Sequence, residues 1–229
     1  MPLTGKRIAV TGAFGSLGAA VVQAALDAGA RVAAIDRADA PPAGMDLGDA
    51  KRFGGVDLSD SAAAQTAIDA ATTALGGLDA LVNIAGTFRF ETLADGSPDT
   101  WDLLYRINLR TAVAASKAAL THLPEGGRIV NIGAAAALKA GAGMGAYAAS
   151  KSGVMRFTES LAEELKPRGI TVNALLPSII DTPPNRKDMP KADFAKWVKP
   201  AQLADVILFL LSDRASAITG ALIPVTGRV

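Results

Sequence analysis

The chain has 229 residues, half of them hydrophobic, and its 23 basic and 22 acidic residues leave a formal net charge of +1. This balance, without runs of like charge, excludes the basic footprint that a nucleic-acid-binding protein needs. The absence of cysteine excludes disulfides, thiolate catalysis and cysteine-ligated metal, and the apolar runs are shorter than the ~18 residues of a membrane span, so we expect a cytoplasmic protein with no metal, nucleic-acid or membrane partner.

Short β-branched runs alternate with long alanine-rich stretches of helical period along the chain. This alternation is typical of a parallel sheet covered by helices on both faces. We predict a single α/β domain over residues 1–229, a Rossmann-type doubly wound sheet of seven parallel strands. Strands are expected at residues 7–11, 31–36, 54–56, 80–84, 128–132, 171–176 and 222–225, and helices at 16–28, 61–75, 100–122, 147–166 and 200–211.

A glycine-rich loop joins the first expected strand to the first expected helix. It has the spacing Gly-x-x-Gly-x-x-Gly. In this context the glycines let the backbone approach a pyrophosphate, whose charge is met by free N–H groups and by the helix dipole. A tight turn of purely structural use is the alternative. We assign to dinucleotide binding Gly12, Phe14, Gly15, Ser16, Leu17 and Gly18.

Asp36 ends the second expected strand, where a carboxylate accepts the ribose hydroxyls of NAD(H) and repels the 2′-phosphate of NADP(H). NAD(H) is therefore favoured over NADP(H). Arg37 offers a phosphate a partner, so NADP(H) use stays open. Asp57 and Leu58 suit the adenine edge, or form a plain turn. After the fourth strand, small residues let the backbone pass the adenosine ribose, which adds Asn83, Ala85 and Gly86 to the cofactor site.

Tyr147 and Lys151 are spaced i, i+4 at the start of an expected helix, so the phenol and the ammonium share one face. A phenol with a pKa of about 10 is a poor acid–base catalyst at neutral pH, and a nearby cation lowers that pKa by ~1 to 3 units. A lysine also holds a ribose. Alone, such a pair is an ordinary surface feature; after a dinucleotide loop, it indicates proton transfer. We expect both residues to catalyse and to contact the cofactor.

These segments together resemble the short-chain dehydrogenase/reductase family over nearly the whole chain. The resemblance implies a nicotinamide-dependent oxidoreductase acting on a small molecule. It also implies that Asn108 anchors a water relay to the lysine, and that Pro177, Ile180 and Thr182 line the nicotinamide side. A helix-capping Asn108 and a loop Thr182 are the structural alternatives. The residues that carry the resemblance are the loop 11–18, Asp36, residues 83–86, Trp101, Asp102, Asn108, Tyr147, Lys151, Pro177 and Thr182.

One position departs from the pattern of this family. The serine that stabilises the reacting carbonyl is replaced by Ala134. Losing such a donor typically slows chemistry that builds an oxyanion by about 100- to 1,000-fold. We therefore expect weak ketone reduction unless the substrate or a lid residue supplies the bond.

Residues 177–200 hold prolines and charges without a clear period, which indicates a substrate lid or an irregular surface loop. With residues 133–138 and 143–144, this segment resembles dihydropteridine reductases, family members that share the glycine spacing, use NADH and lack the serine. Their acceptor takes hydride into an electron-poor ring where no alkoxide develops, so the missing donor matters less. The substrate site is assigned to Ala134, Asn185, Arg186, Met189 and Trp197, with packing of the lid as the alternative.

The sequence thus predicts hydride transfer from NADH to a small planar or conjugated acceptor. One alternative is a carbonyl or alcohol oxidoreductase such as a 3-oxoacyl-thioester reductase. Another is a catalytically weak NAD(H)-sensing protein. The expected helices 100–122 and 147–166 carry more alanine and leucine than one sheet face needs to bury, so we expect a homodimer or homotetramer.

Overall fold

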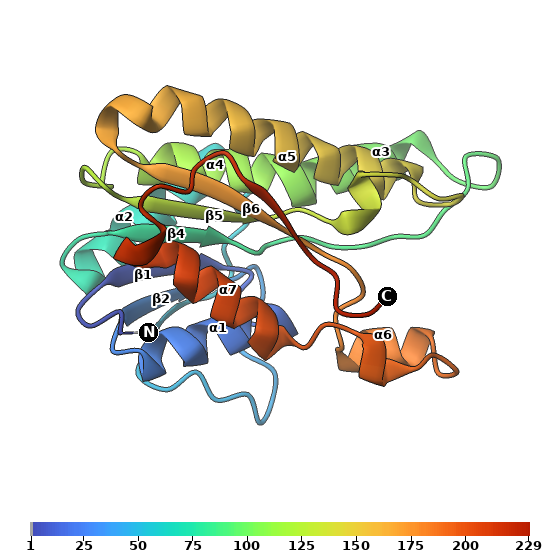
Figure 1. Cartoon of the computed structure of the whole chain (residues 1–229), viewed down its shortest axis with the longest axis horizontal. Coiled ribbons are helices and arrows are strands. Elements are labelled where there is room, and N and C mark those ends of the chain that lie inside the picture. Colours follow the sequence, from blue (N-terminus) through green and yellow to red (C-terminus); the bar gives the residue numbers. More distant parts are fainter. Residues whose placement is uncertain (1) are drawn as a thin grey trace.

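A single parallel sheet organises the chain. The computed structural model describes residues 2–229, and its seven strands have the order β3-β2-β1-β4-β5-β6-β7 (Figure 1). The order reverses between β1 and β4, which is the doubly wound arrangement predicted from the sequence. The strands are β1 (Arg7–Thr11), β2 (Arg31–Ile35), β3 (Lys51–Phe53), β4 (Ala80–Asn83), β5 (Arg128–Ile132), β6 (Thr171–Pro177) and β7 (Leu222–Val225).

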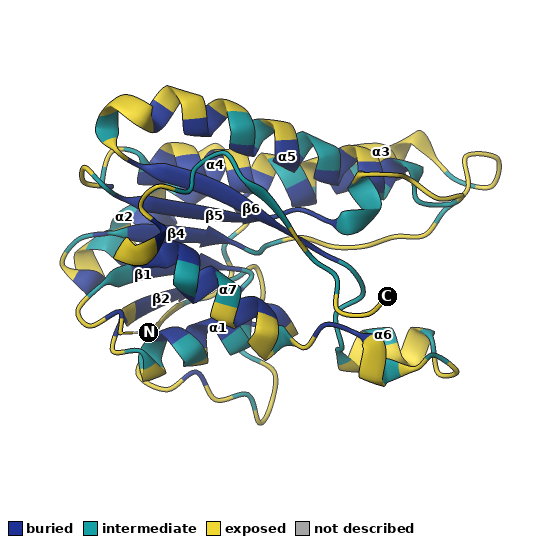
Figure 2. Ribbon diagram, viewed as in Figure 1, coloured by how far each residue is buried: buried dark blue, intermediate teal, exposed yellow. Residues whose placement is uncertain are grey.

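Helices cover both faces of the sheet. On one face α1 (Ser16–Asp27) packs beside α7 (Pro200–Leu211), and on the other lie α2 (Ser61–Leu75), α4 (Thr111–Ala119) and α5 (Gly145–Leu165) (Figure 1). Every residue of β5 and β6 is buried, as Figure 2 shows for the middle of the sheet. Burial on both faces explains why most residues of these strands are apolar.

The long helix predicted over residues 100–122 is interrupted. It consists of α3 (Pro98–Leu104), a π-helical stretch η1 (Tyr105–Arg110) and α4. A π-helix closes each turn with one residue more than an α-helix, and such stretches are rare and frequent at functional sites. Here the wide turn carries Asn108, which is buried at 1% exposure.

The third strand was predicted in the wrong place. The sequence indicated residues 54–56, whereas β3 is Lys51–Phe53 and pairs with Ala33 to Ile35 of β2. The glycines at 54 and 55 instead make a turn, since Gly55 has φ of +72°. Because β3 is an edge strand with Lys51 exposed, it has no apolar signature that a sequence pattern could show.

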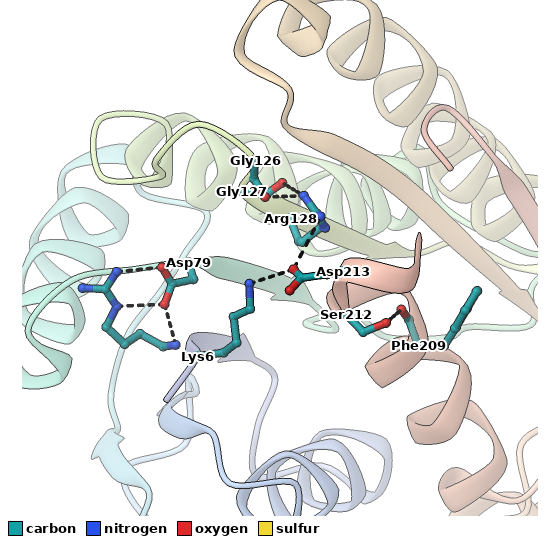
Figure 3. A network of polar contacts seen from close by, with 9 residues as sticks. Lys6, Asp79, Gly126, Gly127, Arg128, Phe209, Ser212 and Asp213 are labelled. Atoms are coloured by element: carbon teal, nitrogen blue, oxygen red, sulfur yellow. Dashed lines mark hydrogen bonds and ion pairs between the residues drawn. The ribbon is translucent and has the colours of Figure 1, made fainter. Parts of the chain in front are cut away.

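Ion pairs hold the amino ends of the strands together (Figure 3). Arg7 makes a two-pronged contact with Asp79, with Nε–Oδ2 and Nη2–Oδ1 distances of 2.8 and 2.6 Å. Asp213, after α7, lies between Lys6 at 3.1 Å and Arg128 at 4.0 Å. This network joins the amino ends of β1, β4 and β5 to the end of α7.

Residues 177–200 have more structure than their sequence indicated. They contain the short helix α6 (Pro183–Asp188) and a 3-10 turn η4 (Phe194–Lys196), and Ile180 pairs with Val198 in an isolated bridge at the base. The helix α6 lies apart from both helical layers, near the carboxyl terminus (Figure 1). The other 3-10 turns are η2 (Ala135–Ala137), η3 (Lys166–Arg168) and η5 (Asp213–Ala215).

Candidate active site

A cleft opens along the carboxyl ends of the strands, beside the neighbouring strands β1 and β4 where the strand order reverses. Its volume is about 1480 Å³, above the ~300–1,000 Å³ of a site for one small ligand. Loops after β1, β2, β4, β5 and β6 form its walls. The cleft therefore has room for a dinucleotide and a second molecule at the topological switch point.

The loop after β1 packs closely against the loop after β4 and leads into α1 at the cleft. Gly12 has φ of +65°, and a Cβ on it would lie 2.7 Å from the backbone nitrogen of Ala85. The helix α1 starts at Ser16 without a side-chain cap, so its first N–H groups and the positive end of its dipole face the cleft. This backbone cradle fits the pyrophosphate of a dinucleotide.

Asp36 is fixed at the end of β2. Its carboxylate accepts the backbone N–H of Phe14 at 2.8 Å and that of Ala38 at 2.9 Å. Asp57 follows the turn after β3, and hydrogen bonds from Ser59, chiefly from its hydroxyl, hold the pKa of Asp57 below its ordinary value. Both carboxylates line the cleft at the end that would receive an adenosine.

Tyr147 and Lys151 open α5 and both line the cleft, as the sequence predicted for this pair. Their electrostatics differ from the prediction that the lysine makes the phenol more acidic. Burial raises the pKa of Tyr147 to about 12, and burial lowers the pKa of Lys151 to about 8. Desolvation by burial causes both shifts, and the ammonium donates to the carbonyl oxygen of Ile132 at 2.8 Å.

Most of the residues assigned from the sequence lie on the cleft. The cofactor residues that line it are Gly12, Phe14, Gly15, Ser16, Leu17, Gly18, Asp36, Arg37, Asp57, Leu58, Ala85, Gly86, Tyr147, Lys151, Pro177, Ile180 and Thr182. Of the expected substrate residues, Ala134, Asn185 and Met189 line it too. The sheet topology brings these separate segments together because all of them follow the carboxyl ends of parallel strands.

Two asparagines assigned to the site lie behind the cleft wall. Asn83 points into the core, where its Nδ2 donates to Ser116 and to Asn131 at 3.0 and 2.9 Å. Its side chain therefore holds helix and sheet together, and only its neighbours reach the cleft. The Asn108 side chain accepts the backbone N–H of Thr87 at 2.7 Å and is buried next to α5.

Arg186 and Trp197 do not reach the cleft, contrary to their assignment to the substrate site. The guanidinium of Arg186 pairs with Asp181, with an Nε–Oδ1 distance of 2.6 Å, and lies over the ring of Phe194. Trp197 is buried and packs on Phe194 at 4.8 Å between ring centroids. Both side chains pack within residues 177–200, the alternative that the sequence left open.

The sequence interpretation missed the wall that faces Tyr147. Phe88 and Phe90 follow the fourth strand and line the cleft at 50% and 65% exposure, and Met144 lies near the start of α5. Two large aromatic side chains, two and four residues after Gly86 in an exposed loop, were the available signal. Other cleft residues that were not assigned include Ser59, Arg89, Arg106, Thr111, Ser178 and Asp188.

Across residues 2–229, no cluster of three or more histidine or carboxylate side chains is arranged to hold a metal ion. In the same residues, no helix combines the length and the apolar character of a membrane span. The side chains on the cleft include a phenol, a buried ammonium and two carboxylates held by hydrogen bonds.

Comparison with known proteins agrees with this arrangement. Residues 12–227 match the family model described as enoyl-(acyl carrier protein) reductase. The chain is 34% identical to 2-(S)-hydroxypropyl-CoM dehydrogenase 3 of Xanthobacter autotrophicus, over 98% of this chain and 96% of that protein. It is 32% identical to the 3-oxoacyl-[acyl-carrier-protein] reductase FabG of Vibrio cholerae, over 99% and 98%.

Among solved structures, a short-chain dehydrogenase of Burkholderia cenocepacia in complex with NADP superposes with a TM-score of 0.87. That similarity covers 99% of this chain and 98% of the other, at 34% sequence identity. The shared sheet, the cleft residues and the named relatives together lead to one assignment. The chain belongs to the short-chain dehydrogenase/reductase family of nicotinamide-dependent oxidoreductases.

Proposed function

We propose that this protein transfers hydride from NADH to a small planar or conjugated acceptor, with Tyr147 as the proton donor. The observation that carries the proposal is that Tyr147 and Ala134 line one cleft with the glycine-rich loop. When bound there, the nicotinamide ring supplies the hydride. The phenol of Tyr147 carries its proton at neutral pH and is therefore in the form that can donate it, although burial, which raises its pKa to about 12, makes it a weaker acid than a free phenol.

Lys151 and Asn108 support this chemistry in different ways. The ammonium of Lys151 is buried beside the cleft and offers hydrogen bonds to a ribose. The side chain of Asn108 lies behind the wall, where it orients the backbone that faces the cleft. Neither residue needs to exchange a proton with the acceptor itself.

The preference for NAD(H) rests on Asp36. Two backbone N–H groups hold its carboxylate at the cleft edge, so the negative charge cannot easily turn away from a 2′-phosphate. Arg37 lies beside it and is the group that would favour NADP(H). We expect a kcat/KM at least about tenfold higher with NADH than with NADPH, a difference of ~1.4 kcal/mol. Asp36→Asn should bring the kcat/KM values for NADH and NADPH closer together. Equal kcat/KM values for the two cofactors in the unaltered protein would contradict the preference.

The acceptor class follows from the walls around Tyr147. Ala134 offers no hydroxyl, and Phe88, Phe90 and Met144 present apolar surface. A conjugated acceptor that spreads its charge over a ring needs no oxyanion donor, which favours a quinonoid dihydropterin or a similar planar molecule. The relatives reported above are named for other substrates, so this part rests on the side chains alone.

A carbonyl or alcohol substrate is the second candidate, because the Vibrio relative is named for reduction of a 3-oxoacyl group. In that case another group must replace the hydroxyl that Ala134 lacks. Family membership favours either enzyme over the NAD(H)-sensing protein.

Turnover of a substrate panel with NADH separates the two candidates. We expect quinonoid dihydropterins or other conjugated acceptors to be reduced faster than ketones and 3-oxoacyl thioesters. The matched variant is Ala134→Ser, which returns the hydroxyl and should raise ketone reduction by about 100- to 1,000-fold while leaving the conjugated acceptor unchanged. Fast reduction of a ketone by the unaltered protein would reverse the order of the candidates.

Two further features support finer proposals. Residues 177–200 contribute Thr182, Asn185 and Met189 to the cleft and are joined at their base by one bridge, which supports a substrate lid.

The helices α3 and α4 with the π-helical stretch expose an apolar stripe, which supports a homodimer or homotetramer. Sedimentation of Trp101→Glu should then show smaller particles. The stripe consists of Trp101, Tyr105 and Val113 at 41, 51 and 38% exposure.

A further inference from the structure

The ring of Tyr147 is held against the cleft by another aromatic side chain. Phe88 meets it edge to face, with ring centroids 4.9 Å apart and planes at 83°. This geometry is favourable for aromatic pairs. Phe88 is half exposed and belongs to a loop, so the core does not fix its position. Contacts that fix this loop, among them the hydrogen bond from the backbone N–H of Glu91 to the carbonyl oxygen of Gly143 at 2.9 Å, therefore also help to fix the phenol.

Asn108 anchors that loop. Its Oδ1 accepts the backbone N–H of Thr87, the residue before Phe88, at 2.7 Å. Space at this point is tight, since a Cβ on Gly86 would lie 2.9 Å from Oδ1 of Asn108 and 3.3 Å from Nζ of Lys151. The loop, the asparagine and the catalytic lysine thus meet at one place.

Ser150 completes the connection to the catalytic helix. Its hydroxyl accepts a hydrogen bond from Nδ2 of Asn108 at 2.9 Å and donates one to the carbonyl oxygen of Tyr147 at 2.8 Å. Ser150 is 5% exposed and Asn108 is 1% exposed, so water cannot replace these bonds easily. The contacts form a closed ring that runs from the Tyr147 backbone through Ser150, Asn108, Thr87 and Phe88 back to the Tyr147 side chain.

We propose that Ser150 is a positioning residue, which holds the phenol of Tyr147 in place by coupling α5 through Asn108 to the loop that carries Phe88. The proposal rests on the proposed role of Tyr147 as proton donor. An alanine at this position removes the acceptor of a buried amide and the tether of the loop. Small displacements of a reacting group from its working geometry lower the rate strongly, by ~100-fold for an error of about 1 Å.

The same helix offers a matched control. Thr158 is fully buried, its hydroxyl donates to the carbonyl oxygen of Val154 at 2.8 Å, and it accepts Nδ2 of Asn131 at 2.9 Å. Like Ser150, it donates to a backbone carbonyl of its own helix and accepts from a buried asparagine. These bonds of Thr158 lie in the core away from the cleft. Thr158→Val therefore leaves a buried asparagine without its acceptor and should destabilise the protein without moving Tyr147.

The kinetic test compares single-turnover reduction of the best acceptor by Ser150→Ala and by Thr158→Val. We expect Ser150→Ala to lower the rate about 10- to 100-fold with the KM for NADH changed less than about threefold. Thr158→Val should stay within about twofold of the parent. Adding Phe88→Ala to Ser150→Ala should lower the rate by less than Phe88→Ala does alone, because both act through one ring of contacts. Equal rates for the two hydroxyl variants, or full additivity, overturn the proposal.

A spectroscopic test needs no substrate. The chain has two tyrosines, so Tyr105→Phe leaves Tyr147 as the only source of tyrosinate absorbance. In this background Ser150→Ala should let water reach the phenol and move its ionisation down by about one pH unit, whereas Thr158→Val should not. An unmoved titration in Ser150→Ala overturns the proposal. If instead the titration moves while Tyr147→Phe keeps full turnover, the positioning stands and the proposed function falls.

Discussion

The amino ends of the strands (the amino edge) and their carboxyl ends (the carboxyl edge) hold charged side chains in opposite ways. At the amino edge, Arg7 and Asp79 form a two-pronged pair, and Asp213 lies between two cations (Figure 3). At the carboxyl edge, Asp36 is held by backbone N–H groups alone, and Lys151 donates to a backbone carbonyl with no carboxylate partner among residues 2–229. Paired charges have little left to offer a ligand, whereas charges held only by the backbone can still bind one.

This comparison predicts that changes at one edge affect chemistry and changes at the other affect stability. The largest effect is expected at the carboxyl edge. Tyr147→Phe should lower kcat by about 100- to 10,000-fold, the usual contribution of a positioned acid. The free energy of unfolding should change little, because the ring and its contact with Phe88 remain. Steady-state kinetics and urea unfolding on the same preparation measure both, and a stability loss without a rate loss would contradict the division.

At the amino edge the expected result is the reverse. Asp79→Asn should lower the free energy of unfolding by about 1.5–3 kcal/mol, because charge-assisted bonds to Arg7 are lost. Since hydrogen bonding by Arg7 holds the pKa of Asp79 below its ordinary value, this stabilisation is present above the unfolded-state pKa and is lost as the pH falls through the folded-state pKa. Urea unfolding at neutral and acidic pH tests it. The difference between parent and variant should shrink in acid, while kcat at neutral pH stays unchanged.

Lys151 gives a smaller effect that depends on pH. Burial lowers the pKa of its ammonium to about 8, so the folded protein loses this charge as the pH rises through about 8. Affinity for NADH should therefore weaken above that pH. Because the charged form is disfavoured by folding, the stability penalty is complete below the folded-state pKa and is relieved as the pH rises from it toward the unfolded-state value. Fluorescence titration of NADH across this range checks the affinity, and Lys151→Gln should give weak binding that is flat with pH.

The smallest effect is expected in residues 177–200. Arg186 pairs with Asp181 on the surface and does not line the cleft, and such exposed pairs contribute about 0–1 kcal/mol. Arg186→Gln should change the KM of the acceptor by less than about twofold, at this level of interaction energy. A much larger rise in KM would show that Arg186 contacts the acceptor, as the sequence predicted. The matched control is Lys187→Gln, on the same short helix.

The regular parts of the fold follow from local patterns in the sequence. Buried parallel strands such as β6 are mostly apolar, and the glycines of the loop after β1 have one context that explains them. The π-helical stretch could not be foreseen, because the residues that form it suit an α-helix equally well. Asn83 and Trp197 were misplaced because residue type and spacing do not say which side of the backbone faces a cavity. The pKa of Tyr147 depends on desolvation, which only the packed structure reveals.

The π-helical stretch η1 contains one residue more than a regular α-helix would have. The extra residue lets the same segment both pack on the sheet and support the site. Because a π-helical turn closes with one residue more than an α-helical turn, removing one residue between 105 and 110 would restore α-helical hydrogen bonding and leave α3 and α4 near their present orientation. The helix α4 would keep its seat on the sheet, while the buried asparagine would leave its serine. A single deletion would thus give a straighter helix and lose the contacts that hold the site. At this bulge, regular helix formation and catalysis therefore require different numbers of residues.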